Sequence, residues 1–203
     1  MDTQRTSSAE LICEAATRLF ARQGFDGTSL QAIAAQVGIT KPTLLYHYPS
    51  KDALRAAVLE NLFAHWRRTV PQLLEAVTSG HARFEALTNE LIRFFREDPD
   101  RALLLMRELM DRPVHMREQV IDNLRPWLRV VAEYIRTGKR IGQIREDVDE
   151  ESYLLHVVTL TIATLSNATL VQAALAPEQP PHAVEERHLR ELRRLAKVSL
   201  FRD

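Results

Sequence analysis

The 203-residue sequence is short of the residues that make turns and cross-links, with one cysteine, six glycines and nine prolines. A single cysteine, Cys13, excludes an intrachain disulfide and a zinc site built from several cysteines. It fits a reducing compartment, so we predict a cytoplasmic protein. The scarcity of glycine and proline argues against a sandwich or barrel with many tight turns. Aromatic residues are only 6% of the chain, but 45% of it is hydrophobic, which is too apolar for a disordered chain.

Neither charge sign is in excess, because 27 basic and 27 acidic residues cancel. A neutral total does not exclude a nucleic-acid partner, since a small local patch can carry the necessary charge. The longest uncharged run, residues 152–177, is long enough to span a bilayer. Nine of its side chains are His, Thr, Ser, Asn or Gln, a heavy polar load for hydrocarbon. We therefore expect no membrane span there, but a helix buried in a bundle or at a dimer interface.

Motifs of common catalytic sites are also missing. The sequence has no Walker loop, no Gly-x-Ser-x-Gly elbow and no His-Glu-x-x-His, and its seven histidines show no metal-ligand spacing. We therefore predict a protein that is not an enzyme and that holds no cofactor and no metal.

The hydrophobic residues that are present recur at the helical period of 3.6 nearly everywhere, which predicts an all-α fold. Gly24, Gly38, Pro49 and Pro71 are among the residues expected to end helices. Pro126 falls inside a helical stretch, where we expect a kink or two helices. The expected helices cover residues 8–23, 29–37, 41–47, 51–69, 71–78, 82–97, 100–111, 114–138, 149–176 and 185–201.

Residues 29–47 have the pattern of a helix-turn-helix. Ala34 and Ala35 keep the first helix thin where the second crosses it, and Gly38 supplies the tight turn. The second helix then presents short donors and acceptors and one cation outward, which suit the base edges and phosphates of a major groove. A pattern of this kind also occurs in helical hairpins that bind nothing. The outward residues are Thr40, Lys41, Thr43 and Tyr46.

The stretch Ile33-Ala-Ala-Gln-Val-Gly-Ile-Thr-Lys-Pro-Thr-Leu-Leu-Tyr-His-Tyr-Pro-Ser-Lys-Asp-Ala-Leu54 resembles the DNA-binding signature of the TetR (tetracycline repressor) family. The preceding Ala15-Ala-x-x-Leu-Phe-Ala-x-x-Gly-Phe-x-Gly-Thr-Ser29 is similar to that family's first helix and turn. Gly142-Gln-Ile-Arg-x-Asp147 looks like the start of its first dimerisation helix. The resemblance implies an N-terminal three-helix helix-turn-helix domain that binds operator DNA as a homodimer. It also implies a C-terminal helical domain for a small-molecule effector and for dimerisation.

Carried over residue by residue, the resemblance implies three groups of DNA contacts. Thr28 and Ser29 match phosphate-holding positions at a helix N-terminus. Lys51 matches the family lysine that meets the DNA backbone. Leu45 departs from the pattern, because the family usually has tyrosine there; Tyr46 or His47 could replace that contact. The third group, at the start of the recognition helix, is Thr40, Lys41, Pro42 and Thr43.

We expect residues 1–50 to form the DNA-binding domain, 51–69 to link the domains, and 51–203 to hold the effector pocket and the dimer interface. Helices at about 149–176 and 185–201 would pair with their copies as a four-helix interface. The effector would be small and apolar or amphipathic. For any single candidate in the pocket, plain core packing is the alternative. These candidates are Trp66, Phe84, Phe94, Met106, Met110, Trp127, Tyr134, His156 and Asn167.

The sequence thus predicts a ligand-responsive, sequence-specific regulator, a repressor acting as a homodimer on a palindromic operator. A second hypothesis is a helical small-molecule-binding protein of the same fold that does not bind an operator. The departure at Leu45 is its only support.

Overall fold

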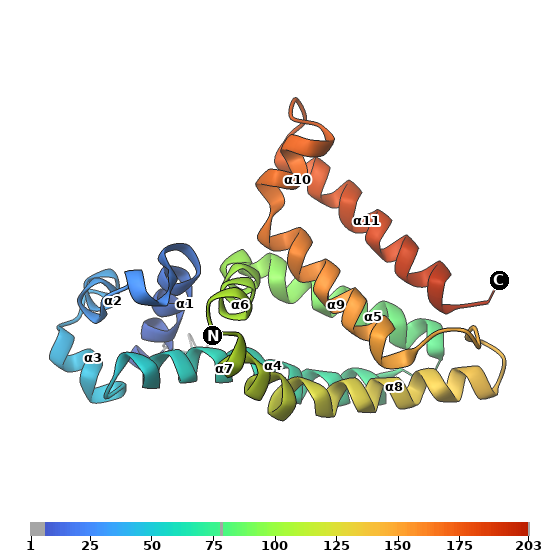
Figure 1. Cartoon of the computed structure of the whole chain (residues 1–203), viewed down its shortest axis with the longest axis horizontal. Coiled ribbons are helices and arrows are strands. Elements are labelled where there is room, and N and C mark those ends of the chain that lie inside the picture. Colours follow the sequence, from blue (N-terminus) through green and yellow to red (C-terminus); the bar gives the residue numbers. More distant parts are fainter. Residues whose placement is uncertain (1–6, 78, 203) are drawn as a thin grey trace, which may run out of the picture. The chain divides into compact units, whose positions relative to one another are not determined.

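A computed structural model of the chain describes residues 7–77 and 79–202, and these residues form helices (Figure 1). In the described part of the chain there is no strand; one isolated antiparallel bridge joins Ile144 and Phe201. The predicted all-α class is therefore confirmed. The elements are α1 (Ser8–Gly27), α2 (Leu30–Val37), α3 (Lys41–His47), α4 (Lys51–Ala76), α5 (Gly80–Glu97), α6 (Pro99–Asp111), α7 (Pro113–Gln119), the π-helical segment η1 (Val120–Leu124), α8 (Arg125–Arg140), α9 (Glu150–Ser166), α10 (Ala168–Leu175) and α11 (Pro181–Leu200).

The chain divides into two compact units, Met1–His65 and Trp66–Asp203. In the N-terminal unit, α1 begins with a capping box in which Ser7 and Glu10 each accept a backbone N–H of the other. The regular dihedrals of α1 stop at Gly24, which has φ 78°, as predicted for a glycine at a helix end. Phe25 follows and its ring lies 5.4 Å from that of Phe20. The core of this unit is fully buried and comes from all four helices: Ile12, Ala16, Phe20, Ile33, Ala34, Leu44, Leu54 and Val58.

In the C-terminal unit α9 is the central helix, and α5, α6, α8 and α11 all contact it. At one end of the unit, Gly142 adopts φ 73° and turns the chain so that Ile144 enters the core. Ile144 is buried there with Ile135, Leu200 and Phe201. The backbone N–H of Arg145 donates to Leu200 O at 3.0 Å, which fixes the end of α11 to the segment before α9.

The predicted break at Pro71 is wrong, because α4 continues through this residue to Ala76. A proline inside a helix removes one backbone hydrogen bond and costs about 3 kcal/mol. Val70 and Leu74, on either side of it, are both buried in the C-terminal unit. Burial of that apolar face offsets the lost hydrogen bond, so the helix persists.

The single helix predicted over residues 149–176 is also wrong, because α9 ends at Ser166 and α10 begins at Ala168. The side chain of Asn167 donates to Ala163 O at 3.0 Å, and the Ser166 hydroxyl donates to the same carbonyl at 3.2 Å. These side chains take the acceptor that the next helical turn would have used. By contrast, the kink or two helices expected around Pro126 is confirmed, since η1 separates α7 from α8 and Pro126 lies in the first turn of α8.

No single helix of the described residues is long and apolar enough to cross a membrane. The pair α9 and α10 meets that test by length and composition but is bent by 82°.

Candidate DNA-binding surface and ligand cavity

The turn between α2 and α3 has the geometry that the helix-turn-helix pattern predicts. Gly38 takes φ 77°, a left-handed conformation that costs glycine little, and its N–H donates to the carbonyls of Ala34 and Ala35. Thr40 then caps α3, because its side chain accepts the Thr43 N–H at 3.3 Å. The two threonine hydroxyls are 2.8 Å apart. The turn and the cap together fix the direction in which α3 leaves α2.

One face of α3 is anchored and the other is open. Leu44 is fully buried, whereas Lys41, Pro42 and Thr43 are exposed and Tyr46 is 87% exposed. The half-buried His47 ring stands edge-on to the Tyr46 ring, with centroids 5.5 Å apart. Between Gly27 and Asp52 the sequence has two lysines and no acidic residue. The open face therefore offers cationic and hydroxyl groups that no carboxylate of this segment neutralises.

Two more predicted contacts lie at helix starts. Ser29 is exposed and caps α2 by accepting the Ala32 N–H at 3.0 Å. Lys51 opens α4, and its Nζ lies 4.3 Å from the centroid of the Phe25 ring. Arg55, one turn further along, lies over the same ring at 5.1 Å. Arg55 is 6% exposed, so it packs over this ring inside the unit and is not one of the exposed candidate contacts.

Thr28 does not share the exposure of the other predicted contacts. It is 2% exposed, and its hydroxyl donates to Gly24 O at 2.8 Å. Its N–H donates to Phe25 O, and Ser29 instead occupies the N-cap of α2. Both donors of Thr28 are therefore occupied inside the N-terminal unit, so the expected phosphate contact through this residue is corrected. Its role is to close the turn after α1.

The half-buried Tyr48 and the buried Cys13 meet inside the N-terminal unit. The Tyr48 hydroxyl donates to Ala9 O at 3.2 Å and lies 3.0 Å from the Cys13 sulfur. Burial raises the pKa of the Cys13 thiol and also the pKa of the Tyr48 hydroxyl. Both groups are therefore neutral at ordinary pH, and they tie α1 to the end of α3.

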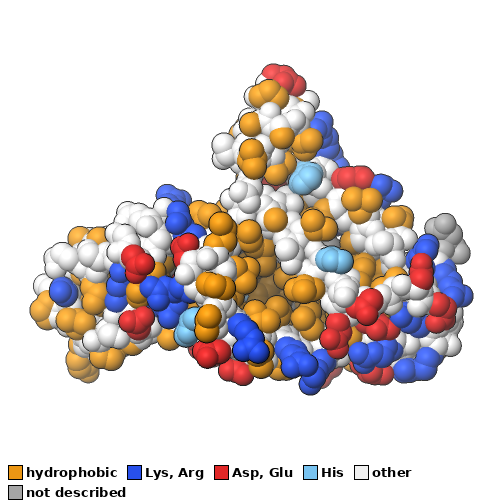
Figure 2. All heavy atoms as spheres, in the orientation of Figure 1, with side chains coloured by type: hydrophobic (Ala, Val, Ile, Leu, Met, Phe, Trp, Pro, Cys, Tyr) orange, Lys and Arg blue, Asp and Glu red, His pale blue; other side chains and the backbone are white. Residues whose placement is uncertain are grey.

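The C-terminal unit contains a cavity of about 150 Å³, which is lined mostly by apolar side chains. It lies among α4, α5, α8, α9 and the end of α11. Three predicted effector-pocket residues, Trp66, Phe84 and Tyr134, line this cavity. Figure 2 shows hydrophobic side chains gathered in a hollow of the same unit beside α8 and α9.

The other predicted pocket residues lie elsewhere in the C-terminal unit. Phe94 is buried behind Trp66, with ring centroids 5.1 Å apart. His156 lines a second, open recess of about 810 Å³ between α9 and α11. Met110 is 76% exposed and Asn167 is exposed at the break after α9. The remaining two, Met106 and Trp127, are half-buried outside the lining of the 150 Å³ cavity.

The sequence analysis missed the polar groups that line this cavity. Arg83 donates from Nε to Leu74 O at 3.3 Å, and its guanidinium carbon lies 4.4 Å from the centroid of the Tyr134 ring. Thr88 is 4% exposed. The Tyr153 hydroxyl donates to Ala196 O at 2.8 Å, and burial raises its pKa. For Thr88 the signal was its i, i+4 spacing from Phe84 on α5, whereas Tyr153 comes from α9.

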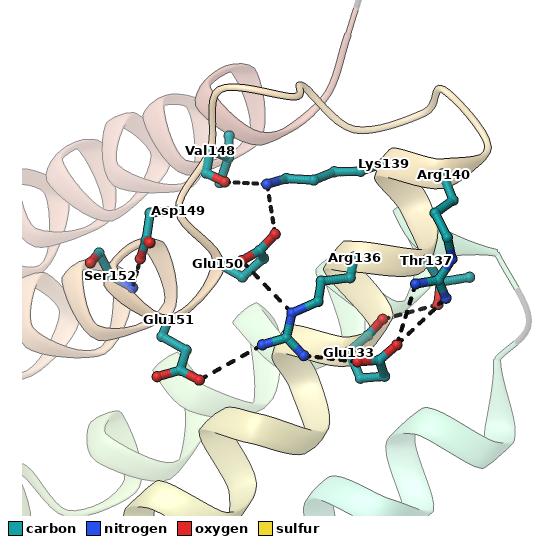
Figure 3. A network of polar contacts seen from close by, with 10 residues as sticks. All are labelled: Glu133, Arg136, Thr137, Lys139, Arg140, Val148, Asp149, Glu150, Glu151 and Ser152. Atoms are coloured by element: carbon teal, nitrogen blue, oxygen red, sulfur yellow. Dashed lines mark hydrogen bonds and ion pairs between the residues drawn. The ribbon is translucent and has the colours of Figure 1, made fainter.

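A network of ion pairs holds the end of α8 to the start of α9 (Figure 3). Lys139 lies 2.6 Å from a Glu150 carboxylate oxygen and donates to Val148 O. Arg136 bridges Glu133 on its own helix to Glu151 on the next. The hydrogen bond from Lys139 lowers the pKa of Glu150. Because Tyr134 and Tyr153 lie on the two helices so joined, this network also holds two walls of the cavity in place.

No group of three or more His, Cys, Asp or Glu side chains that could hold a metal ion occurs among residues 7–77 and 79–202. The open face of α3 carries most of the predicted DNA contacts, and the 150 Å³ cavity is lined by three of the predicted pocket residues. A glycine-turned helix pair with a polar outer helix, followed by a helical unit with an apolar cavity, is the arrangement of a helix-turn-helix regulatory protein.

Comparison with known families agrees with that class. The family model described as "Bacterial regulatory proteins, tetR family" matches residues 12–58. A second, "Tetracyclin repressor-like, C-terminal domain", matches residues 81–195, more than half of the chain. The chain therefore belongs to the TetR family of transcriptional regulators. Members of this family are DNA-binding regulators and not enzymes, so these two predictions are confirmed.

Individual relatives are distant. The transcriptional regulator LmrA of Bacillus subtilis (strain 168) is 29% identical over 168 residues, which are 80% of this chain and 89% of the relative. The repressor DhaR of Mycobacterium sp. (strain GP1) is 24% identical over 147 residues, 71% and 73% of the two chains. Regulator KstR2 of Mycobacterium tuberculosis superposes with a TM-score of 0.73 at 15% identity, over 98% of both chains. A choline-bound regulator of Saccharomonospora viridis gives 0.68 at 21%, over 97% and 98%. Solved structures this distant show the shared fold alone.

Proposed function

We propose that this chain is a ligand-responsive repressor that acts as a homodimer on a palindromic operator. The open, acid-free face of α3, held by the Gly38 turn, is the observation that carries the proposal. In this proposal α3 enters a major groove, where Thr40, Lys41, Thr43 and Tyr46 meet base edges and phosphates. Pro42 pre-forms the first turn of the helix.

The phosphate contacts flank this helix. Ser29 and Lys51 lie at the starts of α2 and α4, where free N–H groups and the helix dipole favour an anion. His47 supplies a further donor beside Tyr46. We assign Thr28 no side-chain contact, because its hydroxyl is buried and bonded.

The homodimer would form through α9, α10 and α11. Large apolar side chains are exposed there, including Leu155, Leu160, Leu195 and Val198, and hydrophobic atoms lie at the surface of these helices (Figure 2). An exposed apolar surface of this extent is typical of an interface. In a dimer, two copies of α3 would face two half-sites, which is why a palindromic operator is expected.

The cavity beneath α5 would bind the effector. An effector that prefers one of two dimer geometries changes operator affinity by its differential binding free energy, and about 1–3 kcal/mol gives a 5- to 150-fold change. Three of the lining residues, Trp66, Phe84 and Tyr134, were predicted from the sequence, and most of the wall is apolar; both observations support this site.

Selection of genomic fragments by the purified protein at about 50 and 200 mM salt tests the proposal. We expect enrichment of a palindrome that persists at the higher salt. Recovery of only salt-labile, sequence-independent binding would contradict it and favour the hypothesis of a ligand-binding protein without an operator.

Single variants then test the contacts. On the selected palindrome, Lys51→Ala should lower the salt slope by about one unit per subunit, and Lys41→Ala should weaken binding. Arg129→Ala, which removes an exposed cation of α8, is the charge-matched control and should leave binding unchanged. An equal loss of DNA affinity in Arg129→Ala would contradict the assignment of the DNA contacts to α3 and α4.

Oligomeric state tests the interface. Light scattering on the intact chain should give the mass of two chains, and Leu160→Glu on α9 should give the mass of one. Met110→Glu changes a side chain that is more exposed, on α6, and should leave the dimer intact. A dimer that survives Leu160→Glu but not Met110→Glu would move the interface to α6.

A further inference from the structure

We propose that the cavity of the C-terminal unit takes a small aromatic monocarboxylate, with its carboxylate on Arg83 and a ring hydroxyl at Thr88. This deepens the proposed function and rests on it for the premise that the cavity is the effector site. The cavity has room for one ring, and its lining contains one charged side chain, Arg83, and the hydroxyl of Thr88.

Size limits the ligand to about one ring. The cavity measures about 150 Å³. An engineered apolar cavity of about 150 Å³ in another protein binds benzene. Trp66, Phe84 and Ile135 provide flat and aliphatic walls suited to a ring.

Charge indicates that the ligand is an anion. Arg83 is the only charged residue in the lining. Within the described residues no acidic side chain forms an ion pair with it. Its Nε is held by Leu74 O and its plane lies over Tyr134, so the orientation of the guanidinium is fixed. The Nη donors then remain for a carboxylate, which a guanidinium binds through two parallel hydrogen bonds.

Thr88 indicates a second polar group on the ligand. Two other buried helical threonines, Thr17 and Thr161, donate to the carbonyl four residues earlier, whereas Thr164, buried on α9, forms no such bond among the described residues. Thr88 is 4% exposed as a residue and is part of the cavity wall, and its hydroxyl forms no hydrogen bond to any residue that the structure describes. A hydroxyl that lines an apolar cavity and is not bonded to the protein can donate to, or accept from, a polar group of a ligand.

The spacing of these two groups fits a substituted ring. Arg83 and Thr88 lie five residues apart on α5, which is about 7.5 Å along the helix axis. A ring with a carboxylate at one end and a hydroxyl at the other spans a separation of this order. 4-Hydroxybenzoate therefore serves as the probe, with benzoate and benzamide as its truncated and uncharged analogues.

Titration calorimetry on the intact wild-type chain, without DNA, tests the ligand class. Benzoate should bind at least about 10-fold more tightly than benzamide, because a charge-assisted hydrogen bond is lost in the amide. 4-Hydroxybenzoate should bind about 5-fold more tightly than benzoate, through one neutral hydrogen bond to Thr88. Equal affinity for benzoate and benzamide, or no binding of any of the three, would overturn the proposal.

Variants assign the two ends of the ligand. Arg83→Met keeps an apolar stem and should remove the preference for benzoate over benzamide. The matched control is Arg101→Met, whose guanidinium carbon lies 4.5 Å from the Phe94 ring centroid outside the cavity lining; it should keep that preference. Thr88→Val should abolish the gain from the ring hydroxyl and leave the benzoate-to-benzamide ratio unchanged. The same loss of preference in Arg101→Met would overturn the assignment to Arg83.

Failure of the proposed ligand class can be distinguished from failure of the proposed regulatory function. Loss of operator binding in the genomic selection, with the benzoate preference intact, would remove the regulatory role and leave the ligand class standing. Release of the selected palindrome by a neutral apolar compound but not by these carboxylates would support the regulatory role and overturn the proposed ligand class.

Discussion

The two units of this protein gather their functional residues in different ways. In the N-terminal unit the candidate DNA contacts lie within residues 29–51, so one turn and two helix starts position them all. In the C-terminal unit the cavity is lined from α4, α5, α8, α9 and the chain end, from Trp66 to Phe201. The comparison teaches that a surface made by neighbouring residues depends on local turn chemistry, whereas a cavity depends on how distant helices meet.

The units also differ in where polar groups are used. In the N-terminal unit the hydroxyl-bearing and cationic side chains of α3 are exposed to solvent. In the C-terminal unit most charged side chains form ion pairs with one another, as Arg136 does with Glu133 and Lys139 with Glu150. Arg83 and Thr88 instead line an apolar cavity. Four experiments test this contrast between the two units.

Leu44→Ala should have the largest effect, because it empties the one fully buried position of α3. A substitution of this kind costs about 2–5 kcal/mol of the free energy of unfolding. Hydrogen exchange should show the loss in the N-terminal unit, with the C-terminal unit unaffected. Leu45→Ala, at a half-buried neighbour, is the control and should cost clearly less. Equal costs would mean that α3 is not anchored by one face.

Gly138→Ala tests the close packing of the C-terminal unit. An added Cβ would lie 2.5 Å from Cδ1 of Ile144, which is buried and cannot move freely. We expect a loss of about 1–3 kcal/mol in chemical denaturation followed by tryptophan fluorescence. Gly27→Ala, where the nearest atom outside the chain neighbours is Cβ of Gln23 at 3.8 Å, should be close to neutral. A neutral Gly138→Ala would contradict the described approach of the two segments.

Tyr48→Phe removes the hydroxyl that joins Ala9 and Cys13. Loss of such hydrogen bonds should cost about 1 kcal/mol in denaturation of the N-terminal unit. The control is Tyr46→Phe at the exposed neighbour, which should leave stability unchanged. If operator affinity falls in Tyr46→Phe alone, the two tyrosines have the separate roles described here.

Acid should weaken the junction of α8 and α9 by the smallest amount. The pKa of Glu150 is lowered by Lys139, and that of Asp149 by its bonds to Ser152. A carboxyl with a lowered pKa stabilises the fold above its ordinary pKa, and this contribution is lost as pH falls through the lowered value. The urea midpoint should therefore fall between about pH 5 and pH 3, and less steeply in Glu150→Gln than in the wild type.

Glu178→Gln provides the charge-matched control for this last experiment, because Glu178 lies exposed in the segment before α11. It should keep the wild-type slope of the urea midpoint against pH. An unchanged slope in Glu150→Gln would show that the pair with Lys139 adds nothing to stability.

Much of the N-terminal unit could be predicted from the sequence. Gly38 and Thr40 act within one turn of their own position, and the structure places both as expected. Thr28 was misassigned because a threonine before a helix can cap it or close the preceding turn, and only the buried position next to Gly24 decides between these. In the same way, the packing of Val70 and Leu74 carried α4 past Pro71.

The sequence by itself determined the all-α fold, the helix-turn-helix and the family, because helical period, caps and turn glycines are local signals. Only the tertiary structure decided which residues share the cavity. Among the predicted aromatic residues, Trp66 and Tyr134 line it and Trp127 does not, and Arg83 and Thr88 were not foreseen. The helical spacing of hydrophobic residues shows which side chains point inward. Which helix such a side chain then contacts depends on packing among segments that can be more than a hundred residues apart, such as Trp66 and Phe201.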